Sequence, residues 1–218
     1  MISLTRTLLV KKRGYRKDIK GDCLSLYLSN TPIFARYLAE RIGDDKKVLV
    51  ELCCGIGVTL EVLATKFRKV IGIDRDKKVL RMCKENLQTV GALGNATLIV
   101  GDIQDEYLFH KLKGDVVIYD IPYWYPGKYP QYTNGEGVDV KNPDLVAVIS
   151  NVRNYISKDI VIFTPREMDY EYFRKKLGRC ECMNVIINGK HDRNCVFLGS
   201  LMKEEGTTLI NLVTEAIL

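Results

Sequence analysis

From about residue 46 onward, short apolar runs rich in Val, Ile and Leu alternate with longer stretches of mixed polarity. Strands separated by helices of this length indicate βαβ units, and therefore a mostly parallel sheet with helices on both faces. The predicted strands are Val48–Leu52, Val70–Asp74, Ala96–Val100, Asp115–Tyr119 and Asp159–Phe163. The predicted helices are Thr59–Phe67, Lys77–Val90, Asp105–Lys111, Pro143–Ile156 and Glu167–Lys176.

The pattern changes after the fifth strand and its helix. Two further apolar runs, Cys182–Ile187 and Cys195–Met202, flank the polar sequence NGKHDRN, which contains Asn188-Gly189. Such a pair of runs predicts an antiparallel hairpin, so the sheet has seven strands in this interpretation. We expect a terminal helix in the tail Glu204–Leu218. Apolar residues at helical spacing also predict a helix at Pro32–Ile42, packed on the sheet.

Length and composition fit one sizeable α/β domain. The chain has 218 residues, of which 46% are hydrophobic and 28% charged. We divide it into a basic N-terminal extension with a helix that packs on the core, residues 1–45, and a main domain, residues 46–218. No apolar run approaches the roughly 20 residues that a membrane span needs. The first residues lack the order of a secretory signal, so we expect a cytoplasmic protein.

Cysteine usage predicts neither disulfides nor a metal site. Seven cysteines, an odd number, follow no regular spacing, which fits reduced and mostly buried thiols. Cys180, Cys182 and Cys195 offer three sulfur ligands, but no second pair of closely spaced cysteines completes a site. Core packing is the favoured interpretation.

The net charge of +6 is concentrated in the N-terminal segment. Charge alone fits two alternatives equally, a solvated arm and a surface that neutralises the phosphates of a polyanion. Tyr15, within the basic run, favours nucleic acid because an aromatic ring stacks on a base. Asp18 is the only acid in the segment, whose basic residues are Arg6, Lys11, Lys12, Arg13, Arg16, Lys17 and Lys20.

A glycine-containing loop follows the first predicted strand and precedes a helix. Gly55 and Gly57 in CCGIGVT have no Cβ, so a ligand can approach the backbone closely. A dinucleotide fingerprint requires a third glycine at position 60, where this chain has Leu60. The loop therefore supports a ligand other than a pyrophosphate.

Three acids follow or close the first three predicted strands. Asp74 is suited to accept hydrogen bonds from both ribose hydroxyls of a nucleoside, and Asp102 from an adenine amino group. Each acid alone also fits a turn residue or a helix cap. Together with Glu51 they lie at the carboxyl ends of successive strands, where open α/β sheets bind ligands.

With these features the chain resembles the class I S-adenosylmethionine-dependent methyltransferases over residues 46–202. The final antiparallel hairpin of the sheet agrees with that Rossmann-like fold. The resemblance implies that Asp74 binds the ribose and Asp102 the adenine of S-adenosylmethionine. A Rossmann enzyme of another kind is the alternative. The other implied cofactor residues are Glu51, Cys53, Gly55, Gly57, Arg75 and Ile103.

The fourth predicted strand runs into DIPYWYPGKY. Its first four residues are similar to the (Asp/Asn/Ser)-Pro-Pro-aromatic motif of methyltransferases that alkylate amino nitrogens, with Ile121 in place of the first proline. In this interpretation Asp120 and a carbonyl near Pro122 accept hydrogen bonds from the two N–H groups of the amino group, and Tyr123 or Trp124 stacks on the base. The alternative is a Pro-containing loop whose aromatic residues are buried.

Within the superfamily the chain resembles the trimethylguanosine synthase family of RNA cap guanine-N2 methyltransferases. Three passages carry this resemblance: YRKDIKGDCLSLYLSNTPIFARYLAERI, ELCCGIGVT and DIPYWYPGKY. The family motif begins with Ser where this chain has Asp120, which resembles tRNA and rRNA guanine-N2 methyltransferases equally well.

The resemblance implies methylation of a purine amino nitrogen in RNA, with guanine N2 favoured. The alternatives are a DNA, protein or small-molecule amino acceptor, and a non-catalytic RNA-binding protein of the same fold. Lys190, His191 and Arg193, assigned here to the hairpin turn, are further candidate contacts. The main candidates for RNA contact are Lys11, Lys12, Arg13, Arg16 and Lys17.

Overall fold

A computed structural model describes residues 5–45, 47–120, 145–164, 166, 168 and 170–214. The chain forms two compact units. The first extends to Asp102 and includes Thr214, and the second is Ile103–Val213. No helix in the described ranges is long and apolar enough to cross a membrane.

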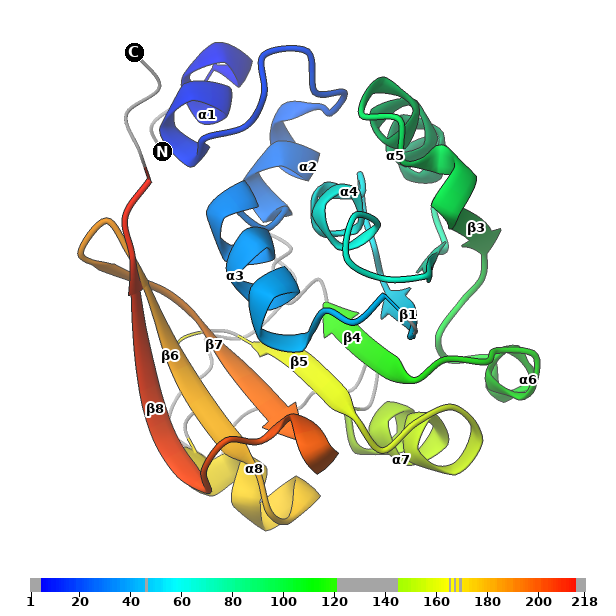
Figure 1. The fold of residues 1–218 in the computed structure, drawn as a ribbon, viewed down its shortest axis with the longest axis vertical. Coiled ribbons are helices and arrows are strands. Elements are labelled where there is room, and N and C mark those ends of the chain that lie inside the picture. The colour runs from blue at the N-terminus through cyan, green and yellow to red at the C-terminus, as the bar shows by residue number, and fades with distance from the viewer. Residues whose placement is uncertain are drawn as a thin grey trace. The chain divides into compact units, whose positions relative to one another are not determined.

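The first unit is built on three parallel strands in the order β3-β2-β1, of which Figure 1 labels β1 and β3. Strands β1 and β2 are buried almost throughout, whereas every residue of β3 is at least partly exposed. Helix α4 follows β1, and α5 with the short 3-10 helix η1 joins β2 to β3. The bounds are β1 Val48–Leu52, α4 Val58–Leu63, β2 Lys69–Asp74, α5 Lys77–Thr89, η1 Leu93–Asn95 and β3 Ala96–Val100.

The N-terminal segment is folded onto this unit through α1 (Arg6–Arg13), α2 (Cys23–Leu28) and α3 (Pro32–Ile42). Its apolar side chains form one cluster with two residues that follow β1, and α3 contacts α4. The N-terminal segment, with its basic residues, is therefore part of a packed layer. The apolar cluster consists of Leu9, Val10, Tyr15, Ile19, Leu26, Ile56 and Val58.

Tyr15 is only 2% exposed, so the expectation that its ring stacks on a base is wrong. Its hydroxyl lies 2.9 Å from the carbonyl oxygens of both Leu26 and Asn30. It also accepts a hydrogen bond from Nε of Arg13 at 3.2 Å. A tyrosine whose ring is apolar and whose hydroxyl finds buried partners suits a core position between helices, which a basic sequence neighbourhood does not reveal.

The second unit contains β4 and β5, which are parallel to each other, and three further strands. Strand β7 is antiparallel to both β5 and β6, and β8 is parallel to β6. Its strand order is β4-β5-β7-β6-β8. The predicted hairpin is confirmed as β6 and β7. The bounds are α6 Glu106–His110, β4 Val116–Asp120, α7 Leu145–Tyr155, β5 Ile160–Thr164, α8 Tyr170–Leu177, β6 Glu181–Ile187, β7 Lys190–Leu198, η2 Gly199–Leu201 and β8 Gly206–Leu212.

The C-terminal tail is a strand, so the prediction of a terminal helix is wrong. Residues of β8 alternate between half-buried and exposed, the period of a strand, and β8 pairs in parallel with β6. Glu181 of β6 secures the tail because its carboxylate accepts from Lys203 N at 2.8 Å and from Thr208 Oγ1 at 2.9 Å. The described residues thus form eight strands, one more than predicted.

The turn of the hairpin is shorter than expected. Asn188 and Gly189 alone connect the strands, with φ of 51° and 72°, the left-handed conformations of a two-residue hairpin loop. The three candidate residues Lys190, His191 and Arg193 therefore lie on β7.

The buried hydroxyl of Tyr15 makes the N-terminal layer testable. We expect Tyr15→Phe to lower the free energy of unfolding by about 1–2 kcal/mol, because the carbonyls around the hydroxyl lose a buried donor. Tyr107→Phe is the control, since Tyr107 is 75% exposed, and should change stability by less than about 0.5 kcal/mol. Urea denaturation measures both. Equal effects of the two variants would contradict the packing described.

Candidate cofactor site

The loop after β1 is held by backbone contacts that continue the pairing of β1 with β2. Cys54 N donates to Ile73 O at 2.9 Å, and Gly55 N donates to Oδ2 of Asp74 at 3.1 Å. Gly57 N closes the turn on Cys54 O at 3.0 Å. The loop is therefore fastened to the end of the neighbouring strand before α4 begins.

The two glycines of the loop have different physical roles. Both have positive φ, 56° at Gly55 and 82° at Gly57. A Cβ on Gly57 would lie 2.5 Å from Sγ of Cys83, so this glycine allows α5 to approach the loop. A Cβ on Gly55 would meet no atom within 4 Å. The backbone at Gly55 is thus open to a ligand.

The three predicted acids lie at the carboxyl ends of three adjacent parallel strands. Glu51 is 1% exposed near the end of β1, Asp74 ends β2 half-buried, and Asp102 is exposed just beyond β3. The register places Asp74 opposite Val100, the last residue of β3. The structure therefore brings the three acids to one edge of this part of the sheet.

The carboxylate of Asp74 is the organising group of this edge. Oδ2 accepts from Gly55 N, and Oδ1 accepts from Asp76 N at 3.0 Å. Burial raises the pKa of Asp74, and these two backbone hydrogen bonds oppose the rise. A half-buried carboxylate that is held by two backbone donors is a preorganised acceptor for a polar ligand.

The remaining predicted cofactor residues differ in exposure. Cys53 is half-buried with φ of 63°, Arg75 is exposed and Ile103 is 7% exposed. Beneath the loop, a hydrogen bond with the Cys83 thiol, together with burial, raises the pKa of Cys54. Cys54 is therefore a protonated packing residue, because reactive cysteines require a thiolate.

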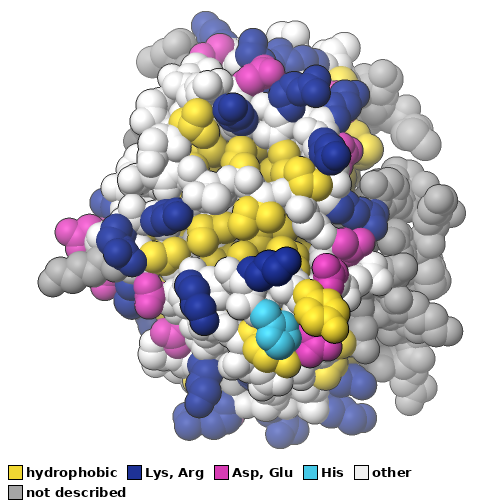
Figure 2. Space-filling model, turned by 90° about the vertical axis from the view of Figure 1, so that its right-hand side faces the viewer, with side chains coloured by type: hydrophobic (Ala, Val, Ile, Leu, Met, Phe, Trp, Pro, Cys, Tyr) yellow, Lys and Arg dark blue, Asp and Glu magenta, His cyan; other side chains and the backbone are white. Residues whose placement is uncertain are grey.

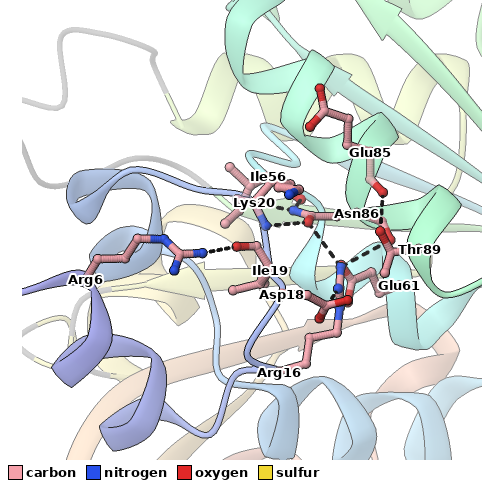
Figure 3. A network of polar contacts seen from close by, with 10 residues as sticks. All are labelled: Arg6, Arg16, Asp18, Ile19, Lys20, Ile56, Glu61, Glu85, Asn86 and Thr89. Atoms are coloured by element: carbon pink, nitrogen blue, oxygen red, sulfur yellow. Dashed lines mark hydrogen bonds and ion pairs between the residues drawn. The ribbon is translucent and has the colours of Figure 1, made fainter.

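Sequence reasoning missed Asn86, which joins α5, the loop and the N-terminal segment (Figure 3). Its Nδ2 donates to Ile56 O at 3.0 Å and to Lys20 O at 2.9 Å. Its Oδ1 accepts from Lys20 N at 2.7 Å and from Nη2 of Arg16 at 3.1 Å. The available signal was a polar amide next to Leu87 on the buried face of an amphipathic helix.

The five predicted RNA-contacting residues fall into two groups. Arg13 donates to Ser29 O at 2.6 Å, and Arg16 forms an ion pair with Glu61 at 3.0 Å. These two arginines bind other parts of the first unit. The side chains of the other three residues are exposed, namely Lys11, Lys12 and Lys17.

The candidate catalytic residues are only partly described. Asp120 is half-buried at the end of β4, opposite Phe163 of β5. Pro122, Tyr123 and Trp124 lie outside the described residues. On β7, Nε2 of His191 lies 2.7 Å from Oδ1 of Asn194, and Arg193 pairs with Asp192 at 2.8 Å.

Comparison with known proteins identifies the family. The model of the RNA cap guanine-N2 methyltransferase family matches residues 46–201. The chain belongs to this family. The match includes the loop after β1, all three acids and Asp120, and it confirms the predicted resemblance.

Two curated relatives match parts of the chain. An uncharacterized RNA methyltransferase of Clostridium tetani is 35% identical over 91 residues, which are 41% of this chain and 19% of that protein. An rRNA N6-adenosine methyltransferase of Caenorhabditis elegans is 34% identical over 68 residues, 30% of this chain and 32% of that protein. The chain thus spans less than a third of the length of either relative.

Solved structures confirm the predicted class I methyltransferase fold. A putative methyltransferase of Porphyromonas gingivalis covers 90% of this chain with a TM-score of 0.65 and 16% identity, over 48% of its own length. A 16S rRNA N2 methyltransferase of T. thermophilus, solved with AdoMet and guanosine, covers 84% with a TM-score of 0.55 and 20% identity, over 44% of its own length.

The cofactor of this family is S-adenosylmethionine, and the residues present fit such a ligand. The open backbone at Gly55 leaves room beside the loop, and the Asp74 carboxylate offers acceptor oxygens for vicinal hydroxyls. In the described ranges, no group of three or more His, Cys, Asp or Glu side chains is arranged to hold a metal ion.

The close approach of Gly57 and Cys83 predicts a specific rescue. We expect Gly57→Ala to lower the free energy of unfolding by about 2–4 kcal/mol, because alanine is strained at this φ and its Cβ meets Sγ of Cys83. Adding Cys83→Ala should restore about 1–2 kcal/mol of this loss by removing the sulfur. Chemical denaturation of Gly57→Ala, Cys83→Ala and the double variant measures the coupling free energy between the two positions.

Gly91→Ala separates the backbone strain from the steric clash. Gly91 also has a positive φ, 70°, but a Cβ there would meet nothing within 4 Å. Its substitution should cost only the strain, about 1–2 kcal/mol. Strictly additive effects of Gly57→Ala and Cys83→Ala would refute the contact.

Proposed function

We propose that this protein transfers a methyl group from S-adenosylmethionine to an exocyclic amino nitrogen of a purine in RNA, with guanine N2 as the acceptor. The observation that carries the proposal is the family match over residues 46–201. It coincides with a loop and three acids at the carboxyl edge of β1, β2 and β3, where open α/β sheets bind ligands.

In this proposal the residues of the loop and those at or just after the ends of β1, β2 and β3 bind the cofactor, which supplies an activated methyl group. The Asp74 carboxylate accepts hydrogen bonds from the ribose hydroxyls, and Asp102 accepts from the adenine amino group. The open backbone at Gly55 admits the cofactor to the loop. Contacts from the remaining predicted residues complete the set: Glu51, Cys53, Arg75 and Ile103.

Asp120 orients the acceptor nitrogen. An exocyclic amino group is a poor nucleophile because its lone pair is delocalised into the ring. Hydrogen bonds from its two N–H groups to Asp120 and to a backbone carbonyl near Pro122 direct the lone pair and stabilise the charge that develops. Tyr123 or Trp124 stacks on the base. The nitrogen loses its proton readily after methylation, so no histidine base is required.

Adenine N6 is a second candidate acceptor. The C. elegans relative is an rRNA N6-adenosine methyltransferase by name. The same arrangement of Asp120 and a carbonyl would orient an adenine amino group. The identity of the methylated nucleoside separates the two candidates.

The experiment is methyl transfer from labelled S-adenosylmethionine into RNA, followed by nucleoside identification. We expect label in N2-methylguanosine, and a fall in kcat of about 10²–10³ in Asp120→Ala from the lost electrostatic contact. Asp45→Ala is the control, because Asp45 is exposed, and should retain activity. Label in N6-methyladenosine would overturn the guanine assignment, and no label in RNA despite cofactor binding would overturn the RNA assignment.

Asp74 predicts the pH dependence of cofactor binding. Burial raises its pKa, so it takes up a proton at a higher pH than an ordinary aspartate. The ionised form is the better acceptor, so the Kd of S-adenosylmethionine should rise as pH falls through this pKa, by up to about 10-fold per pH unit. Calorimetric titration across the acidic range measures this.

Asp74→Asn tests the origin of the effect. An amide keeps only one acceptor oxygen, so we expect binding about 30- to 100-fold weaker at neutral pH. The acid-dependent loss should also disappear. Asp45→Asn should behave as the wild type, and an unchanged pH profile in Asp74→Asn would show that another group titrates.

A further inference from the structure

Helix α5 carries four exposed basic residues at helical spacing. Lys77, Arg81 and Lys84 are separated by four and three positions, and Lys78 lies beside them. Residues three and four apart are neighbours on a helix surface, so these side chains form one strip, which we call the α5 basic stripe. Figure 2 shows the face on the α5 side of Figure 1, where Lys and Arg side chains are among those exposed on its upper part.

The α5 basic stripe contradicts local helix electrostatics. Lys77 and Lys78 are the first two residues of α5, whose first turn contains no acid. Positive charge there opposes the helix macrodipole, and the like-charged neighbours Lys77, Arg81 and Lys84 repel one another. Asp76, the N-cap, offsets part of this by accepting from Lys78 N at 2.7 Å, and Lys78 has a further electrostatic interaction with Asp22, where it helps to lower the pKa of that carboxyl.

Within the described residues, no close ion pair relieves the repulsion within the α5 basic stripe. Elsewhere in the unit Arg16 pairs with Glu61 at 3.0 Å and Lys66 with Glu40 at 3.1 Å. None of the four residues of the α5 basic stripe forms such a pair with a described acid, including Glu85 on the same helix. A surface that breaks local rules with little internal compensation is expected at a functional site.

The stripe begins beside the candidate cofactor site. Asp76, which caps α5, donates its backbone N–H to Oδ1 of Asp74 at 3.0 Å. Asn86 holds the backbone of Lys20 against the same helix, and the Lys20 side chain is exposed (Figure 3). At 1.5 Å per residue, the stripe is about 10 Å long, the length of about three nucleotides of a stacked strand.

We propose that the α5 basic stripe binds the phosphate backbone of the RNA substrate where it enters the site. This inference rests on the proposed function, because it takes RNA as the substrate. Lys77, Lys78, Arg81 and Lys84 neutralise consecutive phosphates without reading sequence, as backbone contacts do. The phosphates in turn relieve the repulsion within α5.

A four-fold variant tests the stripe against a control of equal charge. The stripe variant carries Lys77→Gln, Lys78→Gln, Arg81→Gln and Lys84→Gln. The control removes four exposed charges from the second unit, with Lys111→Gln, Lys113→Gln, Lys175→Gln and Lys176→Gln. Fluorescence anisotropy measures binding of a labelled single-stranded RNA of mixed sequence, about 30 nucleotides long, across a series of salt concentrations.

We expect the stripe variant to bind this RNA about 10- to 100-fold more weakly at roughly 0.1 M salt. The slope of log Kd against log salt should fall by about 2–3, since each lost phosphate contact removes about 0.7. Methyl transfer should show a raised KM for RNA with kcat retained. This result is expected when the lost contacts bind the substrate and the transition state equally. The control should keep most of the wild-type slope.

Two further readouts separate binding from folding. The stripe variant should bind S-adenosylmethionine as the wild type does, and its Tm should be equal or higher because like charges are removed. A stripe variant with wild-type RNA affinity and slope would overturn this inference and leave the proposed function intact. Anisotropy also measures binding of polyglutamate, which stands for an acidic protein. If the stripe variant lost polyglutamate binding but retained RNA binding, the stripe would be assigned to an acidic protein and this inference would be overturned. Failure of the wild type to bind or methylate RNA would overturn the proposed function itself.

Discussion

The pairing of β1 with β2 extends past the end of β1 into the loop between β1 and α4. Cys54 N donates a hydrogen bond to Ile73 O, and Gly55 N donates one to the carboxylate of Asp74. These two contacts determine where the loop lies, and they immobilise the acid that ends β2. An acceptor that is already oriented loses little entropy when a ligand binds. The two contacts therefore prepare the site on the folded scaffold.

The N-terminal segment is fixed to the same loop through Asn86. This side chain uses both its donor and its acceptor atoms on backbone groups of Lys20 and Ile56. A buried polar network of this kind specifies one arrangement when its members are satisfied. The segment that carries the exposed lysines is thus held next to the loop, and α5 extends the positive surface.

Strands β1 and β2 of the candidate site could be predicted because they are buried almost throughout. Such strands appear as continuous apolar runs, as in Val48–Leu52 and Val70–Asp74. The acids after them could be predicted because the carboxyl ends of parallel strands share one edge. The strand β8 was missed because its face is only half-buried, and its pairing with β6 is a tertiary contact.

The basic cluster shows why charge composition alone predicts a surface poorly. Arg13 and Arg16 have the same formal charge as Lys11 and Lys17, but they bind Ser29 O and Glu61 within the fold. Arginine forms such multiple contacts more readily than lysine because of its planar group of donors. Tyr15 likewise serves the core. Partner groups distant in sequence decide these roles.

Two ligands that differ only in the ribose test the role of Asp74 in cofactor binding most directly. Calorimetry would measure binding of S-adenosylhomocysteine and of its 2′,3′-dideoxy analogue to the wild-type protein. We expect the analogue to bind about 30- to 100-fold more weakly, because the carboxylate of Asp74 loses both hydroxyl donors. Equal affinity for the two ligands would contradict the assignment of this edge of the sheet to the cofactor.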